Sequence, residues 1–245
     1  MIITSEAVVL NSRKYGDTSK IVSCFTKEQG KVSFIAKGAR SKNNKFGSLL
    51  EPLNCIIASY YFKPGRDLQL ITGADLLLSV RQLHSDIEKL AYGLSVLESI
   101  SQALAPLEQN TGVFDLLINF IEAISNNKAH HFSLFVKSQI QLAELLGFAL
   151  DFNHFLASNG ETKMFSLENG SIIDDRSYKN NNILYLEEEI LDKFIKLSNN
   201  DMEGIYDIMF DKKDEPIVVN FFIKYFGFHL ESKFFYKSMN LVNIF

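Results

Sequence analysis

The chain has 245 residues, of which 47% are hydrophobic and 22% charged, a balance that is ordinary for a folded protein and excludes a disordered one. No apolar run reaches the roughly 18–20 residues that cross a bilayer, which argues against a membrane-spanning protein. The net charge of −4 is unevenly spread: residues 1–80 hold 11 Lys and Arg against 6 Asp and Glu, whereas residues 81–245 hold 14 against 23. Such a split predicts two domains with different partners.

The N-terminal segment and the two cysteines favour a cytoplasmic protein. Residues 1–17 place an acid inside the apolar stretch and basic residues after it, which is the wrong order for a secretory signal. Cys24 and Cys55 lie in strand-like segments and suggest no disulfide framework. We expect both to be buried thiols in a reducing compartment.

Residues 1–80 are expected to form five short strands separated by turns. The third strand alternates clearly, with Val32, Phe34 and Ala36 on one face. Five strands with a long connection between the third and fourth are typical of an OB-type barrel, and a five-stranded SH3-like barrel is the alternative. The expected strands are Ile2–Leu10, Ser19–Thr26, Lys31–Gly38, Asn54–Phe62 and Leu68–Leu76.

From Arg81 onward the apolar period changes from two residues to about 3.6, which predicts helices. The polar segment 151–182 interrupts them, and within it KMFSL and SII are expected to form a hairpin across ENG. The expected helices cover residues 87–104, 113–124, 132–146, 186–197 and 217–226. The sequence therefore predicts an α+β protein, with a five-stranded OB-type barrel at 1–80 and a mostly helical domain at 81–245 that carries a small irregular hairpin insertion.

Motifs for catalysis and for metal binding are missing. No Walker A motif, GxGxxG after a strand, GxSxG or HExxH occurs. The pair His130–His131 stands at a helix start, and a helix dipole accounts for the acidic run Glu187–Glu189. No Cys or His cluster has the spacing of metal ligands. We expect neither an enzyme nor a cofactor; the alternative is an enzyme that uses Asp174 and Asp175 with a divalent metal.

A basic segment without acids follows the third expected strand. Gly38 and the small residues beside it would let a phosphate backbone approach closely, whereas the bland alternative is a solvated lysine-rich loop. Other basic residues belong to turns that an OB barrel can bring to the same side. The basic residues are Lys31, Lys37, Arg40, Lys42 and Lys45 in the segment, Arg13, Lys14 and Lys20 near the first turn, and Lys63 and Arg66 in the fourth-to-fifth turn.

Aromatic residues among these strands suit the same chemistry. Single-stranded nucleic acid is held by a cationic groove together with rings that stack on bases, at about 1–3 kcal/mol per base. Tyr15, Phe46, Tyr60 and Tyr61 are candidates for stacking, and each also suits a core position. The pattern indicates a nucleic-acid-binding barrel. An RNA-binding OB protein and a protein adaptor whose lysines only confer solubility are the alternatives.

The segment Arg13–Leu53 resembles the N-terminal signature of the bacterial recombination-repair RecO family. The shared pattern is a Tyr-Gly-acid turn, a strand ending in Phe-Thr, a glycine turn, and Ala-Lys-Gly-Ala-Arg followed by more basic residues. The helical region that follows agrees in length and layout, whereas the resemblance is weak beyond Leu150. The matching residues are Tyr15, Gly16, Asp17, Phe25, Thr26, Gly30, Ala36, Lys37, Gly38, Ala39 and Arg40.

The resemblance implies a protein that binds single- and double-stranded DNA, anneals complementary strands, and is cytoplasmic and nucleoid-associated. It implies RecR as a partner in placing RecA on DNA coated by the single-strand-binding protein SSB, and it implies docking of the acidic C-terminal tail of SSB. By position, Lys37 and Arg40 would contact the DNA backbone. Charge alone adds Lys42, Lys45, Lys14, Lys20, Arg13 and Arg66.

One departure from the family concerns zinc. Many relatives carry a four-cysteine zinc site after the third helix, but Phe155 and Ser158 take the places of its first Cys-x-x-Cys, and no cysteine follows Cys55. We therefore expect no structural zinc and a hairpin held by apolar packing. The residues expected to pack there are Phe155, Met164, Phe165 and Ile172.

Overall fold

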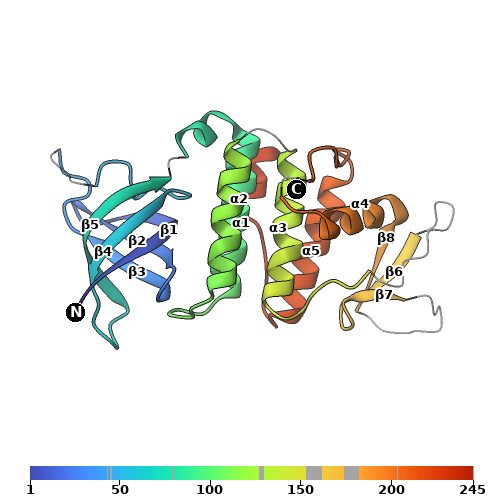
Figure 1. Ribbon diagram of the computed structural model, residues 1–245, viewed down its shortest axis with the longest axis horizontal. Helices are drawn as coiled ribbons and strands as arrows, with labels where there is room; N and C mark the ends of the chain where they lie inside the picture. The colour runs from blue at the N-terminus through green and yellow to red at the C-terminus, as the bar shows by residue number, and fades with distance from the viewer. Residues whose placement is uncertain are drawn as a thin grey trace. The chain divides into compact units, whose positions relative to one another are not determined.

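The computed structural model describes most of the chain as two compact units (Figure 1). The barrel unit comprises residues 1–86 and 100–121, and the helical unit comprises residues 87–99 and 122–245. The division passes through α1 (Ile87–Ala103) and α2 (Thr111–Ser125). The described residues are 1–42, 44, 46–78, 80–126, 130–152, 162–173, 182–202 and 204–244, with the backbone alone at 81 and 84.

The barrel unit contains a closed five-stranded barrel. Its strands are β1 (Ile2–Tyr15), β2 (Ser19–Thr26), β3 (Gly30–Ala36), β4 (Cys55–Tyr61) and β5 (Leu68–Leu78). They follow the order β1-β2-β3-β5-β4, and β4 pairs with β1 to close the barrel. β3 and β5 are parallel, whereas the other neighbours are antiparallel. This is the strand order of an OB barrel, so the predicted OB-type fold is confirmed over the SH3-like alternative.

The first strand is longer than the sequence pattern predicted. The sequence pattern predicts an end at Leu10, but β1 continues to Tyr15. β2 pairs with β1 from Ala7, opposite Thr26, to Tyr15, opposite Ser19, and so supplies hydrogen-bonding partners for the added residues. A register shift after Val9 accompanies this extension. The turn is therefore confined to residues 16–18, and Arg13 and Lys14 lie on a strand.

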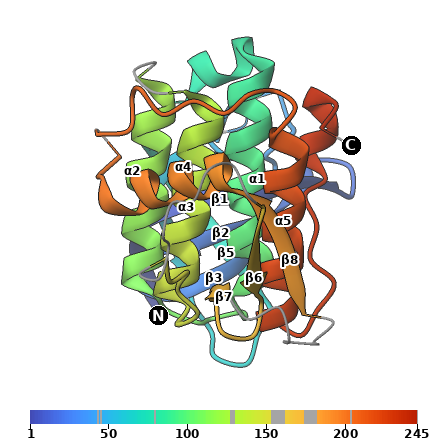
Figure 2. The same cartoon turned by 90° about the vertical axis from the view of Figure 1, so that its right-hand side faces the viewer.

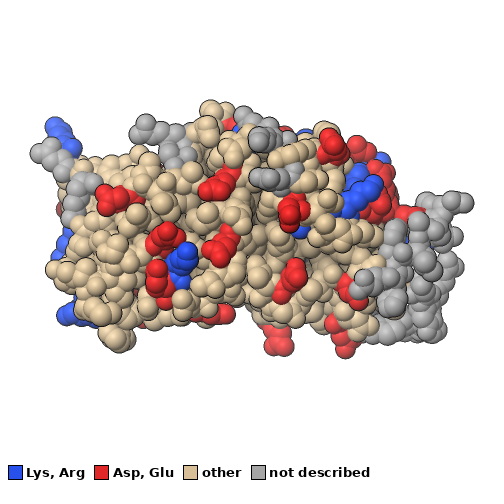
Figure 3. Space-filling model, in the orientation of Figure 1, with Lys and Arg blue, Asp and Glu red and all other residues tan. Residues whose placement is uncertain are grey.

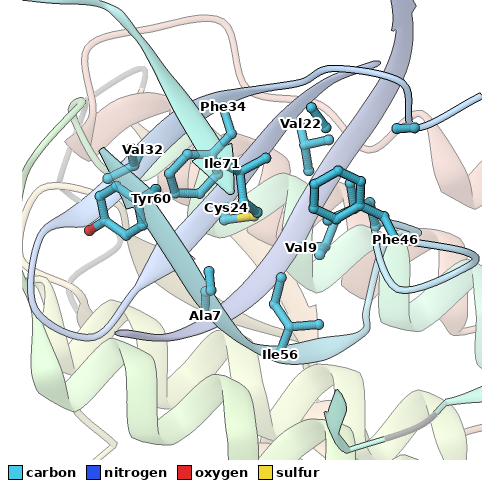
Figure 4. Close-up of a cluster of buried hydrophobic side chains, with 14 residues drawn as sticks. Ala7, Val9, Val22, Cys24, Val32, Phe34, Phe46, Ile56, Tyr60 and Ile71 are labelled. Carbon is cyan, nitrogen blue, oxygen red and sulfur yellow. The ribbon is translucent and has the colours of Figure 1, made fainter. Parts of the chain in front are cut away.

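Alternate side chains of the strands fill the barrel. Val32, Phe34 and Ala36 of β3 all point inward and are buried, as the alternation predicted. Phe34 packs on the ring of Tyr60, with the ring centroids 4.7 Å apart (Figure 4). The predicted burial of Cys24 and Cys55 is confirmed. The core thus consists of side chains from every strand, and Tyr60 belongs to it.

The connection between β3 and β4 runs over residues 37–54, and its described residues, all but 43 and 45, form a plug at one end of the barrel. Phe46 and Leu50 are buried in the same apolar cluster as the strand residues (Figure 4 labels Phe46). Asn44 Oδ1 accepts hydrogen bonds from the backbone N–H groups of Phe46 and Gly47, and Asn54 Nδ2 donates to the Ser48 carbonyl at 2.8 Å. The long connection is therefore a folded cap, and Phe46 is a core residue.

Residues 105–109 pack against the turn between β2 and β3. The Leu107 N–H donates to the Lys31 carbonyl at 3.0 Å, and Gln109 Nε2 donates to the Lys27 carbonyl at 3.2 Å. Gly30 adopts a φ of +65°, and a Cβ placed on it would lie 2.0 Å from the Glu108 carbonyl oxygen. Only glycine satisfies both conditions.

The helical unit is built on aromatic packing. α3 (His131–Leu145) packs against α4 (Glu188–Asn199) and α5 (Glu215–His229), and the short 3-10 helix η2 (Ser238–Val242) follows α5. The other 3-10 helix, η1 (Arg81–Ser85), belongs to the barrel unit. The ring of Phe135 meets Phe222 edge-on, with centroids 6.3 Å apart. The predicted helices are confirmed, with ends displaced by a few residues. Among the described residues, no helix combines the length and the apolar character needed to span a membrane.

A small three-stranded sheet is formed by the predicted insertion, residues 151–182, together with the residues directly after it. β6 (Thr162–Ser166) and β7 (Ser171–Ile173) form the expected hairpin, and Phe165 and Ile172 are buried in it. β8 (Ile183–Glu187), which the sequence analysis assigned partly to a helix, pairs with the other edge of β6 (Figure 2). The sequence pattern did not predict β8, because its five residues lead directly into α4 and no glycine or proline marks the boundary between strand and helix. Phe155 and Ser158 lie outside the described residues.

Substitution at Gly30 tests the packing of residues 105–109. We expect Gly30→Ala to lower the free energy of unfolding by about 3 kcal/mol or more, because the left-handed backbone and the collision with Glu108 act together. The control is Gly65→Ala, which has a φ of +74° but open space around its Cβ, and should cost about 1–2 kcal/mol. Equal losses in urea unfolding would show that the close approach does not matter.

Candidate nucleic-acid interface

Six of the predicted site residues gather at one end of the barrel, which we call the basic end. The β1–β2 turn and the C-terminus of β3 meet there, since Tyr15 lies opposite Ser19 and Lys20 lies opposite Ala36. The plug begins at the same end. The basic end consists of Arg13, Lys14, Lys20, Lys37, Arg40 and Lys42, all of them exposed except the half-buried Lys20.

The strand register divides these side chains between two faces. Residues directly opposite one another on antiparallel strands share a face. Arg13 therefore shares the outer face of the sheet with Ile21 and Tyr15, whereas Lys14 and Lys20 lie opposite each other on the other face. Tyr15 is 48% exposed and stands beside Arg13, an arrangement suited to a stacked base next to a phosphate.

Arg40 joins the plug to the β1–β2 turn. Its backbone N–H donates to the Thr18 carbonyl at 2.8 Å, and its guanidinium Nη1 donates to the Gly16 carbonyl at 3.1 Å. A guanidinium has five N–H donors, so this bond leaves further donors for a phosphate. The residue thus holds two loops of the basic end together while its side chain remains exposed.

Lys20 is paired with an acid. Its ammonium lies 2.6 Å from a carboxylate oxygen of Glu51, and its side chain is only 17% exposed. The pair offsets the repulsion between Lys20 and Lys14, which are cross-strand neighbours of like charge. Sequence spacing did not predict the pair, because 31 positions separate the partners and the plug brings them together.

Two expectations about the basic patch are wrong. Lys31 does not extend it, because its ammonium donates to the Ser101 and Leu104 carbonyls at 2.7 and 2.6 Å, and burial lowers its pKa. Arg66 and Lys63 do not share a side with the basic end. The β4–β5 turn that holds them lies at the opposite end, since Tyr61 pairs with Ile2 at the start of β1 (Figure 1).

The remaining candidates divide as follows. Lys45 lies outside the described residues, and its contact with DNA stays a prediction, as does that of Arg66. Of the four stacking candidates, Phe46 and Tyr60 are core residues. Tyr61 is 44% exposed but lies at the end opposite the basic end. On the face shown in Figure 3, basic side chains lie along the left margin of the barrel, and another lies farther in, among acidic side chains.

Three carboxylates come together in the helical unit. Ligand atoms of Glu189, Asp211 and Asp214 all lie within 4.8 Å of one another. Lys193 donates to Glu189 at 2.7 Å and lowers its pKa, whereas burial raises the pKa of Asp214. A lysine therefore already compensates part of this charge. Asp174 and Asp175, the residues of the enzyme alternative, lie outside the described residues.

Lys31, which lies in β3, and Lys37, which directly follows β3, should differ in how much each contributes to stability. We expect Lys31→Met to lower the free energy of unfolding by about 1–3 kcal/mol, because two helix-end carbonyls lose their donor. Lys37→Met, at an exposed position, should change it by less than about 0.5 kcal/mol. Urea unfolding of both variants measures this difference, and similar values for the two would contradict the structural role of Lys31.

Comparison with known proteins agrees with this architecture. The family model "Recombination protein O N terminal" matches residues 1–80, and "Recombination protein O C terminal" matches residues 84–237. The DNA repair protein RecO of Salinibacter ruber is 31% identical over 173 residues, which are 70% of this chain and 66% of that protein. The RecO proteins of Chloroherpeton thalassium and Chlorobaculum parvum are 38% and 36% identical over 62% and 65% of this chain, and over 59% and 61% of their own lengths.

The chain thus spans less than two thirds of the length of these relatives. The two family models nevertheless adjoin and together extend over both the barrel and the helices. Because the C-terminal model alone covers more than half of the chain, the chain belongs to the recombination protein O (RecO) family.

Proposed function

We propose that this protein binds DNA through the basic end of its barrel and acts in DNA repair by recombination. In this proposal residues 1–80 form the nucleic-acid-binding domain and residues 81–245 form a helical domain for protein contacts. The observation that supports it best is the gathering of six cations from β1, β2 and the plug at one end of an OB barrel. Membership of the RecO family, whose relatives in Salinibacter ruber and Chloroherpeton thalassium are named DNA repair protein RecO, supports the biological role.

Contact with the phosphate backbone requires no base-specific code. Lysine and arginine neutralise phosphates and release counterions, so log K should fall by about 0.7 per phosphate contact on single strands for each unit of log salt. Two strands held along one cationic surface also repel each other less. The protein would therefore bind single- and double-stranded DNA and anneal complementary strands without a covalent step, as a non-catalytic protein.

The helical domain is proposed to contact proteins. Residues 81–245 carry 23 acidic against 14 basic residues, a balance that disfavours contact with DNA. We propose RecR and the acidic C-terminal tail of SSB as its partners. Together with RecR, the protein would help to load RecA onto SSB-coated DNA in the cytoplasm. The SSB tail would need an apolar pocket with a basic residue at its rim.

Annealing of complementary strands tests the whole proposal. The rate of duplex formation should rise with the protein, persist on strands coated with SSB, and fall as salt increases. A chain that binds matched RNA more tightly than DNA would instead favour an RNA-binding role. A chain that binds neither nucleic acid at low salt would favour an adaptor.

Charge removal at the basic end should weaken binding and flatten its salt dependence. In the variant Lys14→Gln/Lys37→Gln/Lys42→Gln, the slope of log K against log salt should decrease by about 2, since each lysine contributes about 0.7. These lysines are exposed, so the fold should tolerate the change. The matched control is Lys213→Gln/Lys224→Gln/Lys233→Gln, three exposed lysines of the helical unit. Fluorescence anisotropy over a salt series measures both, and equal slopes would exclude the basic end.

Release of Lys20 from its acid should strengthen binding. In Glu51→Gln the ammonium of Lys20 loses its partner and becomes available to a phosphate, so the affinity for single strands should rise about twofold to fivefold. Glu6→Gln is the control, because it makes the same charge change in the 3.5 Å pair with Lys27, away from the basic end. An equal gain in both variants would mean that net charge alone governs binding.

A further inference from the structure

Three carboxylates of the helical unit meet where α4 begins and where the segment before α5 ends. Glu189 is the second residue of α4, Asp211 lies in the segment that leads to α5, and Asp214 directly precedes α5. Ligand oxygens of the three all lie within 4.8 Å of one another. Acidic clusters are common at protein surfaces, so the surroundings of each carboxylate decide what this one can do.

Asp214 distinguishes this cluster from an ordinary acidic surface. The residue is only 3% exposed, whereas Glu189 and Asp211 are exposed. It occupies the N-cap position of α5, where an aspartate usually accepts a hydrogen bond from the first turn, but its side chain makes no capping bond. Among the residues that the structure describes, none donates a hydrogen bond to this carboxylate or forms an ion pair with it. Its carboxylate is instead directed at two other acids.

The lysines nearby do not supply the missing partner. The ammonium of Lys193 donates to Glu189 Oε1 at 2.7 Å and lies over the ring of Phe210, 5.3 Å from its centroid. Lys213 is exposed, and both lysines act on Asp214 only through attraction at longer range. A buried carboxylate without a partner is costly, and like charges beside it add to the cost. A cation bound between the three carboxylates would remove both costs.

The ligand atoms and their spacing favour a calcium ion. Carboxylate oxygens suit Ca²⁺, Mg²⁺ and Mn²⁺, whereas soft ligands such as thiolates are absent from this cluster. Calcium binds oxygens at about 2.3–2.6 Å, so two oxygens on opposite sides of the ion lie about 4.6–5.2 Å apart. Magnesium binds at about 2.0–2.1 Å and allows only about 4.2 Å across the ion. Separations of up to 4.8 Å therefore fit calcium without rearrangement.

We propose that Glu189, Asp211 and Asp214 bind one divalent cation, with Ca²⁺ preferred over Mg²⁺. The ion joins the first turn of α4 to the residue that precedes α5. Because β8 leads directly into α4, the ion also fixes the edge strand of the small sheet relative to α5. Water completes the six to eight ligands of calcium, and with Lys193 beside the site the Kd should be about 0.1–1 mM. This site is independent of the DNA binding proposed for the barrel.

Titration of the whole chain with metal tests the proposal directly. After treatment with EDTA and dialysis, the protein is titrated with CaCl₂, MnCl₂ and MgCl₂ in a calorimeter at constant ionic strength, so that charge screening is equal throughout. We expect one Ca²⁺ per chain and weaker binding of Mg²⁺. At about 10 mM CaCl₂ the unfolding temperature should rise by roughly 3–10 °C. No binding of Ca²⁺ at this concentration would overturn the proposal and leave Lys193 as the counter-ion of the cluster.

The variant Asp214→Asn distinguishes a metal ligand from an acid that only supports the fold. It keeps the shape of the side chain and removes the buried charge, so in EDTA its unfolding temperature should be higher than that of the unchanged protein. The rise caused by Ca²⁺ should disappear. A lower unfolding temperature in EDTA with an unchanged response to Ca²⁺ would assign Asp214 to the fold alone and refute the site.

Two further variants complete the test. Asp211→Asn lies at an exposed position, so it should fold as the unchanged protein does and weaken Ca²⁺ binding about tenfold. The matched control is Asp207→Asn, which makes the same charge change in the same segment, at an exposed position outside the cluster, and should bind Ca²⁺ unchanged. Binding that persists in both cluster variants, or that weakens equally in the control, would contradict the proposal.

Discussion

The plug formed by residues 37–54 is the constraint on which the barrel unit depends. A five-stranded barrel leaves its ends open, and here Phe46 and Leu50 close one of them by packing into the same core as the strands. The closure also fixes the positions of charges. Glu51 lies one residue beyond Leu50 and meets Lys20, and Arg40 lies at the start of the plug, where it bonds to the β1–β2 turn. Apolar burial, which is not directional, thus determines where directional charge-assisted bonds form.

Basic residues with similar sequence surroundings have different structural roles in this protein. Lys31 stabilises the C-terminal end of α1, where exposed carbonyls carry partial negative charge and a cation is favoured. Lys20 neutralises an acid of the plug, and Arg40 joins two loops while keeping donors exposed. Lys37 has a similar position in the sequence, but it is exposed. The number of basic residues in a segment therefore overstates the charge that a ligand meets.

The helical unit solves a different problem, the burial of charge among aromatic rings. Glu215 is 2% exposed, and its carboxylate accepts a hydrogen bond from the Tyr92 hydroxyl at 3.0 Å and pairs with Lys212 at 3.2 Å. Burial and the nearby carboxylate together raise the pKa of Tyr92, so the hydroxyl remains a donor. A buried charge without such partners would be costly. The buried Glu215 carboxylate is thus compatible with a dense core, because Tyr92 and Lys212 partner it.

The sequence by itself determined the barrel, the helices and the chemical character of the basic segment. Alternation in β3, glycine at the tight turns and the change of period at Arg81 are local patterns. Such patterns can be recognised in the sequence without knowledge of the fold. It also indicated the RecO family through residues 13–53. Only the tertiary structure decided which cations share one end, because that depends on strand register. The register sent Arg66 to the opposite end, and the plug turned Phe46 inward and brought Glu51 to Lys20. It likewise placed Ser23 directly opposite Ser33 on neighbouring strands, although ten positions separate them in the chain. Such contacts depend on distances in space that spacing along a chain does not encode.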